Sequence, residues 1–160
     1  MRLYRVAELT AQRMTRDADA VYTALTESSA VDLGEYWPAL HYTLSGEAPM
    51  PRYVALADGV EWDDESLENA LMGGEPTPYE DGLAVARVLS PKTVQTLWSR
   101  LHKLTPEDLW DQVDEGIDDF LPADWPGPKK RATVAASFMR LADCFGAAAN
   151  AGEGILLYVP

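Results

Sequence analysis

The spacing of hydrophobic residues along this chain predicts which segments form helices and which form strands. Short apolar runs or alternating residues predict strands at 3–6, 53–56, 83–89 and 155–159. Apolar residues at helical spacing predict helices over 7–14, 17–27, 65–72, 91–103 and 132–151, with another opening at Thr105-Pro106. Ser90 and Thr105 precede Pro91 and Pro106, the arrangement typical of a helix start.

The segment from 31 to 46 predicts a further amphipathic helix with its own stop signal. Asp32 and Glu35 have the spacing of a reciprocal N-terminal cap, whereas Pro38 favours a start near Trp37, so the first residue of the helix stays open. Gly46 can supply the left-handed exit. The residues expected to face the core are Leu33, Trp37, Leu40 and Leu44.

These elements predict an α+β fold. Three or four short strands are separated by helical segments of uneven length, and no regular βαβ repeat is present. We therefore expect a small mixed or antiparallel sheet covered by several helices, in a single domain over residues 1–160. The apolar strand near the C-terminus is expected to be central in the sheet.

The charge of the chain narrows its possible partners. Twenty-six acidic residues against thirteen basic ones give a net charge of −13, which disfavours nucleic-acid phosphates and anionic membrane surfaces. The acids form two clusters: Asp58, Glu61, Asp63, Asp64, Glu65 and Glu68, then Glu107, Asp108, Asp111, Asp114, Glu115, Asp118, Asp119 and Asp124. Such faces either attract a basic protein or simply keep the surface solvated.

The cysteine content and the N-terminus favour a soluble, cytoplasmic protein. Cys144 is the single cysteine, which excludes an intrachain disulfide, and its place in a predicted helix favours a buried, inert thiol. The first residues lack the apolar core of a signal peptide, and no apolar run is long enough to span a bilayer.

No catalytic, metal or cofactor motif is found along the chain. Ser45 and Ser90 fit helix ends and not a nucleophile elbow, and two distant histidines with one cysteine do not have metal-ligand spacing. Neither acidic cluster contains a calcium loop, and the Gly73-Gly74 turn lacks the lysine of a phosphate loop. We therefore assign no catalytic residue, no cofactor and no metal.

Three segments in order resemble the YfbM-like family of bacterial proteins, a domain of unknown function (1877). They are Leu-Gly-Glu-Tyr-Trp-Pro-Ala-Leu-His-Tyr-Thr-Leu-Ser-Gly at 33–46, Asn-Ala-Leu-Met-Gly-Gly-Glu-Pro at 69–76 and Ala-Arg-Val-Leu-Ser-Pro-Lys-Thr-Val at 86–94. The resemblance covers nearly the whole chain and implies an α+β fold in a cytoplasmic bacterial protein. It implies no activity. The chain departs from the family pattern at Gly34, Pro38 and Leu121-Pro122.

Four residues at family positions form the candidate pocket: Trp37, His41, Glu75 and Arg87. They could converge on one cleft, or an ion pair between Arg87 and Glu75 could fasten the Gly-Gly turn to the sheet. A lone histidine such as His41 either bonds a backbone carbonyl or faces a pocket.

Two functions follow as hypotheses. The first is a non-enzymatic protein-binding module with acidic surfaces, such as an immunity-type inhibitor of a basic toxin. The second is a small-molecule-binding or weakly hydrolytic pocket around His41, acting with a carboxylate such as Glu75.

Overall fold

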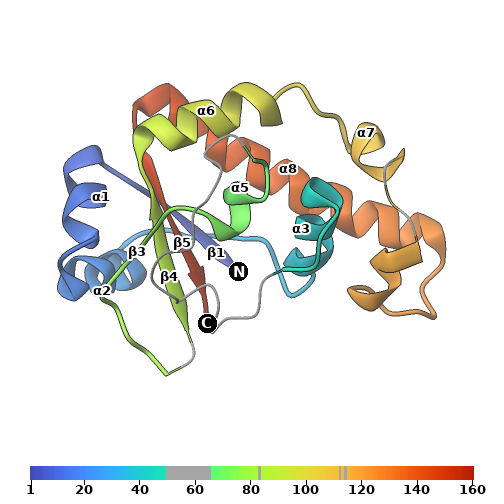
Figure 1. Ribbon diagram of the computed structural model, residues 1–160, viewed down its shortest axis with the longest axis horizontal. Coiled ribbons are helices and arrows are strands. Elements are labelled where there is room, and N and C mark those ends of the chain that lie inside the picture. Colours follow the sequence, from blue (N-terminus) through green and yellow to red (C-terminus); the bar gives the residue numbers. More distant parts are fainter. Residues whose placement is uncertain (50–65, 83, 112, 114) are drawn as a thin grey trace.

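The computed structural model describes residues 1–49, 66–82, 84–111, 113 and 115–160 and arranges them as helices around one sheet (Figure 1). The strands are β1 Arg2–Val6, β2 Val31–Asp32, β3 Glu75–Pro76, β4 Val85–Leu89 and β5 Gly154–Val159. The helices are α1 Glu8–Met14, α2 Ala18–Glu27, α3 Trp37–Ser45, α5 Asn69–Met72, α6 Pro91–Leu101, α7 Pro106–Asp111 and α8 Gly127–Ala151, with a 3-10 helix η1 at Glu115–Asp119.

The five strands form one antiparallel sheet in the order β2-β1-β5-β4-β3. The α+β prediction is confirmed, and of the two sheet types left open the antiparallel one is found. Strand β5 is central, as its apolar sequence predicted, with Leu157 opposite both Leu3 of β1 and Arg87 of β4.

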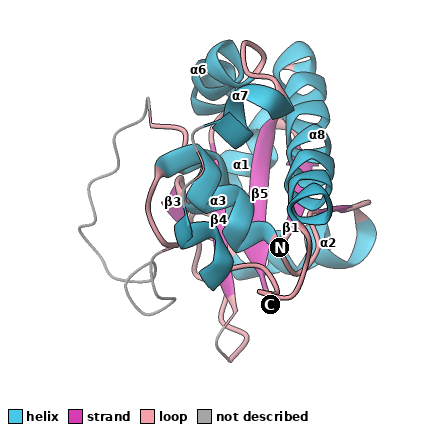
Figure 2. Ribbon diagram, turned by 90° about the vertical axis from the view of Figure 1, so that its right-hand side faces the viewer, coloured by secondary structure: helices cyan, strands magenta, loops and turns pink. Residues whose placement is uncertain are grey.

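Helices cover both faces of the sheet. One face carries Leu3, Val85, Leu89 and Leu157 and packs against α3, α5, α6, α7 and α8. The other carries Tyr4, Val88 and Leu156 and packs against α1 and α2. In Figure 2, α3 and α7 lie in front of the strands, α6 above them and α8 to their right, and α1 and α2 lie behind them.

Strand β4 is buried along its whole length, which corrects the prediction of a half-buried strand. All five residues of β4 are buried, including the charged Arg87. The alternating sequence predicts one buried and one solvated face. In the fold, Ala86 and Val88 are sealed by α1 and α2, while Val85 and Leu89 lie in the larger core.

Helix α3 begins at Trp37, so the reciprocal cap by Asp32 and Glu35 is not formed. The Asp32 carboxylate instead accepts a hydrogen bond from the Gly34 amide at 2.8 Å, in a turn that leaves β2. Pro38 occupies the first turn of the helix, where its missing N–H costs nothing. Gly46 ends α3 at φ 75°, as predicted.

Several other elements differ from the sequence prediction in their bounds or were not predicted. Helix α8 begins five residues early, at Gly127 after Pro126, and α5 spans four residues. The two-residue edge strands β2 and β3 were missed. The predicted strand at 53–56 and most of the first acidic cluster fall outside the described residues.

The Ser90 cap of α6 is confirmed, since its hydroxyl accepts the Thr93 N–H at 3.1 Å. None of the helices described is both long and apolar enough to cross a membrane.

Candidate functional site

His41 lies on the inner side of α3, where it bonds the backbone that follows the helix. Its side chain is 3% exposed, and its Nδ1 lies 3.2 Å from the Glu47 carbonyl oxygen and 3.3 Å from the Ser45 hydroxyl. Because a carbonyl only accepts, Nδ1 carries the proton in the neutral ring. No carboxylate among the described residues bonds the ring. Of the two roles left open for His41, the contacts are those of the structural one.

Arg87 fastens the Gly73-Gly74 turn through carbonyl oxygens. Its Nε donates to Gly73 O at 3.2 Å and to Gly74 O at 3.1 Å, and its Nη2 also donates to Gly74 O. The side chain is buried, and the loss of hydration lowers the pKa of Arg87 from its ordinary value. The guanidinium nevertheless stays charged at neutral pH.

The sheet places Glu75 and Arg87 on opposite faces. Glu75 of β3 pairs with Val88, so its side chain shares the α1 face, while Arg87 points into the larger core together with Val85 and Leu89. The ion pair between Arg87 and Glu75, one of the two arrangements considered from the sequence, is therefore not formed, and Arg87 bonds the Gly-Gly turn through its carbonyl oxygens instead. Trp37 is half-buried against the larger core, which covers the face of the sheet opposite to Glu75.

The second acidic cluster forms an exposed surface on α7, η1 and the loop before α8. The members whose side chains are described form what we call the acidic segment: Glu107, Asp108, Asp111, Asp118, Asp119 and Asp124. Two of them are paired within the chain, Asp118 with Lys130 at 2.5 Å and Glu107 with Arg131 at 3.7 Å. Asp111, Asp119 and Asp124 form no ion pair with any residue that the structure describes.

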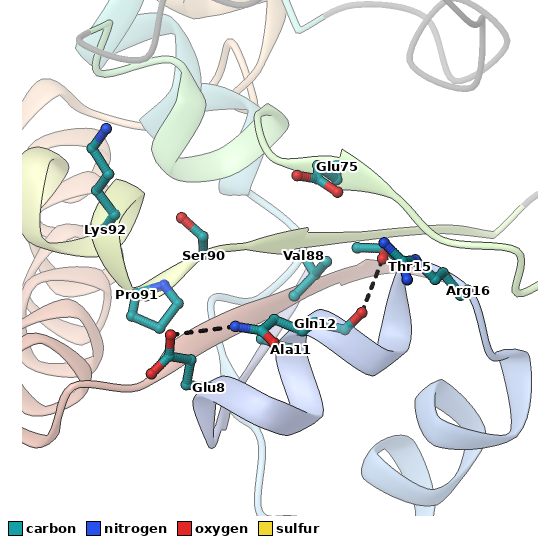
Figure 3. Close-up of a pocket in the computed structure, with 10 residues that line it drawn as sticks. All are labelled: Glu8, Ala11, Gln12, Thr15, Arg16, Glu75, Val88, Ser90, Pro91 and Lys92. Atoms are coloured by element: carbon teal, nitrogen blue, oxygen red, sulfur yellow. Dashed lines mark hydrogen bonds between the residues drawn. The ribbon is translucent and has the colours of Figure 1, made fainter.

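A hollow of about 380 Å³ lies between α1, β3 and the start of α6 (Figure 3). Its polar lining comes from four charged residues, Glu8, Arg16, Glu75 and Lys92, and from Gln12, Thr15 and Ser90; its apolar lining is Ala11, Val88 and Pro91. Of the four residues predicted to share a cleft, only Glu75 lines it.

The sequence did not predict that polar residues of α1 line a hollow. Glu8, Gln12 and Thr15 follow one another at i, i+4 and i+7, which is the signature of a helical stripe. A polar stripe ordinarily faces solvent, so the pattern alone did not distinguish a cavity wall from a surface. Only the pairing of β3 with β4 brings Glu75 opposite this stripe.

The described residues include no cluster of three or more His, Cys, Asp or Glu side chains that could bind a metal ion. Cys144 is buried, as predicted, and desolvation raises the pKa of its thiol to about 11. A thiol with this pKa is almost wholly protonated at neutral pH, which makes it a poor nucleophile.

Comparison with known families decides the assignment of the chain. The model of a domain of unknown function, DUF1877, matches residues 2–158. The chain belongs to the DUF1877 family. The YfbM-like resemblance drawn from the three sequence segments is thereby confirmed. No curated protein matches this DUF1877 chain.

A solved relative has the same fold as this DUF1877 domain. YfbM from Escherichia coli, described as a protein of unknown function, is 15% identical and superposes with a TM-score of 0.71, over 99% of this chain and 98% of that one. At this identity the likeness establishes the fold alone. Family membership therefore fixes the architecture of the DUF1877 domain and leaves its activity to be argued from its own residues.

The buried imidazole of this DUF1877 domain predicts a specific pH dependence of stability. Desolvation is the main cause that lowers the pKa of His41 below 6.5 in the folded state. As pH falls below about 6.5, the unfolded chain takes up a proton that the folded chain refuses, so stability is lost until the lowered pKa is passed. Urea unfolding between pH 8 and 5 should show a steeper loss in wild type than in His41→Asn. Parallel curves would contradict this assignment.

Proposed function

We propose that this DUF1877 chain is a cytoplasmic, non-enzymatic module that binds a basic protein through the acidic segment, as an immunity-type inhibitor does with a basic toxin. The observation that carries the proposal is the exposure of three acids, Asp111, Asp119 and Asp124, which lack an ion-pair partner among the described residues. The overall charge of −13 adds a long-range attraction for a basic partner.

The acidic segment is held on a packed scaffold, which suits rapid capture of a partner. Buried Leu109, Ile117 and Leu121 anchor α7, η1 and the following loop in the larger core. Two aromatic contacts fix the same region to α3: Tyr42 with Phe120 at a centroid distance of 5.3 Å, and Tyr36 with Trp125 at 5.1 Å. A pre-organised charged surface loses little conformational entropy on binding.

The acids differ in how available they are to a partner. Asp108 accepts hydrogen bonds from the Thr105 N–H and hydroxyl, both at 2.8 Å, and these bonds lower the pKa of Asp108. Asp118 is partly neutralised by Lys130, whose own side chain is buried. The proposed contact is therefore made chiefly by Asp111, Asp119 and Asp124.

The test compares two triple variants with the same change in net charge. One is Asp111→Asn/Asp119→Asn/Asp124→Asn; the control is Glu27→Gln/Glu80→Gln/Asp143→Asn, at exposed sites elsewhere. Affinity capture from the source organism at low salt should yield a basic protein with wild type and the control. For that purified protein, the association rate of the first variant should fall about tenfold, because steering depends on local charge.

Two further measurements test the proposal: the salt dependence of the association rate and the growth of cells that produce the captured protein. Raising the ionic strength should slow association, and co-expression of the chain should relieve any growth inhibition by the captured protein. Binding that is insensitive to salt, or an equal loss in both triple variants, would overturn the acidic segment as the binding surface. A captured protein with no toxicity would leave a binding module and remove the immunity role.

A further inference from the structure

We infer that the hollow between α1, β3 and α6 is a binding site for a small zwitterion of the amino-acid class with an apolar side chain. The hollow is separate from the acidic segment, so this inference is independent of the proposed function. Its volume of about 380 Å³ lies within the range of small-molecule sites.

The charges around the hollow are balanced, in contrast to the chain as a whole. Glu8 and Glu75 contribute two negative charges, and Arg16 and Lys92 contribute two positive ones. A simple anion would meet the two carboxylates, and a simple cation would meet the two basic groups. A ligand that carries both charges can place each one beside its complement.

Three of these four charged groups have no partner within the described structure. Glu8 accepts a hydrogen bond from Gln12 Nε2 at 3.3 Å. The side chains of Arg16, Glu75 and Lys92 form no hydrogen bond or ion pair with a described residue, although nearby Arg13 is paired with Asp17 at 2.6 Å. The unpaired groups come from the turn after α1, from β3 and from α6, so only the tertiary fold brings both signs to one hollow.

The base of the hollow favours an apolar group on the ligand. Ala11 and Val88 are each 3% exposed and line the hollow beside Pro91. Thr15, which also lines the hollow, donates its hydroxyl to the Gln12 carbonyl at 3.0 Å, so its donor is already satisfied. An aliphatic side chain resting on Ala11, Val88 and Pro91 would remove apolar surface from water.

The test is a titration of the ¹⁵N-labelled full chain with L-leucine, followed by amide chemical shifts. We expect saturable shifts in the backbone amides of Ala11, Gln12 and Val88 and in the side-chain amide of Gln12, with a dissociation constant in the millimolar range. Two analogues are the ligand controls: 4-methylpentanoate lacks the amine, and isopentylamine lacks the carboxylate. Each should bind about fivefold more weakly, the factor expected for losing one exposed ion pair.

Protein variants test the same pairing from the other side. Glu75→Gln and Arg16→Gln should each weaken L-leucine about fivefold, whereas the exposed controls Glu80→Gln and Lys103→Gln should bind as wild type does. In Glu75→Gln, isopentylamine should lose affinity and 4-methylpentanoate should not. Absence of saturable shifts up to high millimolar L-leucine, equal affinity for the three probes, or unchanged binding in both charge variants would overturn the site.

Discussion

Gly154→Ala should destabilise the protein by about 3 kcal/mol, because the new methyl group meets atoms that cannot all move away. A Cβ at Gly154 would lie 2.6 Å from the Leu89 carbonyl oxygen and 3.0 Å from the Ala11 Cβ. Leu89 belongs to β4, and Ala11 lies on α1, so relief requires shifting either the central strand pair or the helix above it. The free energy of unfolding in urea measures the effect.

The control for this substitution is Gly127→Ala. Gly127 is the first residue of α8, and a Cβ there would meet nothing within 4 Å. Alanine also favours a helix over glycine, so stability should be unchanged or slightly raised. Equal effects of the two substitutions would show that close approach at Gly154 does not limit packing. Because Ala11 also lines the hollow, an altered L-leucine affinity in Gly154→Ala would report a displaced α1.

Arg87→Met should cost about 3 kcal/mol, although methionine fills much of the same space. The substitution removes the donors to the Gly73 and Gly74 carbonyl oxygens within a buried region. Carbonyl groups left without a donor in the interior lose the compensation for their lost hydration. Unfolding in urea provides the measurement.

Arg13→Met supplies the comparison for a surface arginine. Arg13 of α1 pairs with Asp17, the N-cap of α2, and its side chain is 66% exposed. Solvent screens such a pair, so this variant should lose much less stability than Arg87→Met. A near-neutral Arg87→Met would mean that the Gly-Gly turn does not depend on the buried guanidinium. The fold would then have to hold that turn chiefly by its close contact with β4.

That close contact explains why the turn contains glycine. Gly74 has φ 86°, and a Cβ there would lie 2.5 Å from the Val88 carbonyl oxygen. Gly74 thus combines a positive φ with a close approach to the backbone of β4, and both favour glycine. The sequence alone did not show that Arg87 bonds the carbonyl groups of this turn, because the two are distant in sequence and their contact depends on the β3–β4 register.

The sequence predicted helix ends correctly where a capping residue in the helix itself fixes the end. Ser90 before Pro91 and Gly46 after α3 have the predicted geometry. Asp32 does not cap a helix because β2 pairs with β1 at that residue and the chain then turns at Gly34, so that α3 begins only at Trp37. Tertiary pairing overrode a cap motif worth only about 1 kcal/mol.

Candidate site residues were the least predictable part. His41, Glu75 and Arg87 are candidates because they occupy family positions. Such positions do not show on which face of the sheet a side chain lies. Successive residues of a strand point to opposite faces, so the Glu75–Val88 register alone separates Glu75 from Arg87. The hollow could not be predicted because its walls are an ordinary polar helix stripe and the start of a distant helix.

The sequence by itself determined the α+β class, the apolar central strand, the starts of α6 and α7, the end of α3, the acidic balance and the family. These properties depend on hydrophobic spacing, capping residues and composition, which act within one element or over the whole chain. Only the tertiary structure decided that β4 is sealed on both faces, that Arg87 bonds the Gly-Gly turn, and that Glu75 lies opposite Arg16 and Lys92 around a hollow. Strand register and the packing of helices on the sheet decide which distant side chains meet. The spacing of residues along the sequence carries no information about either.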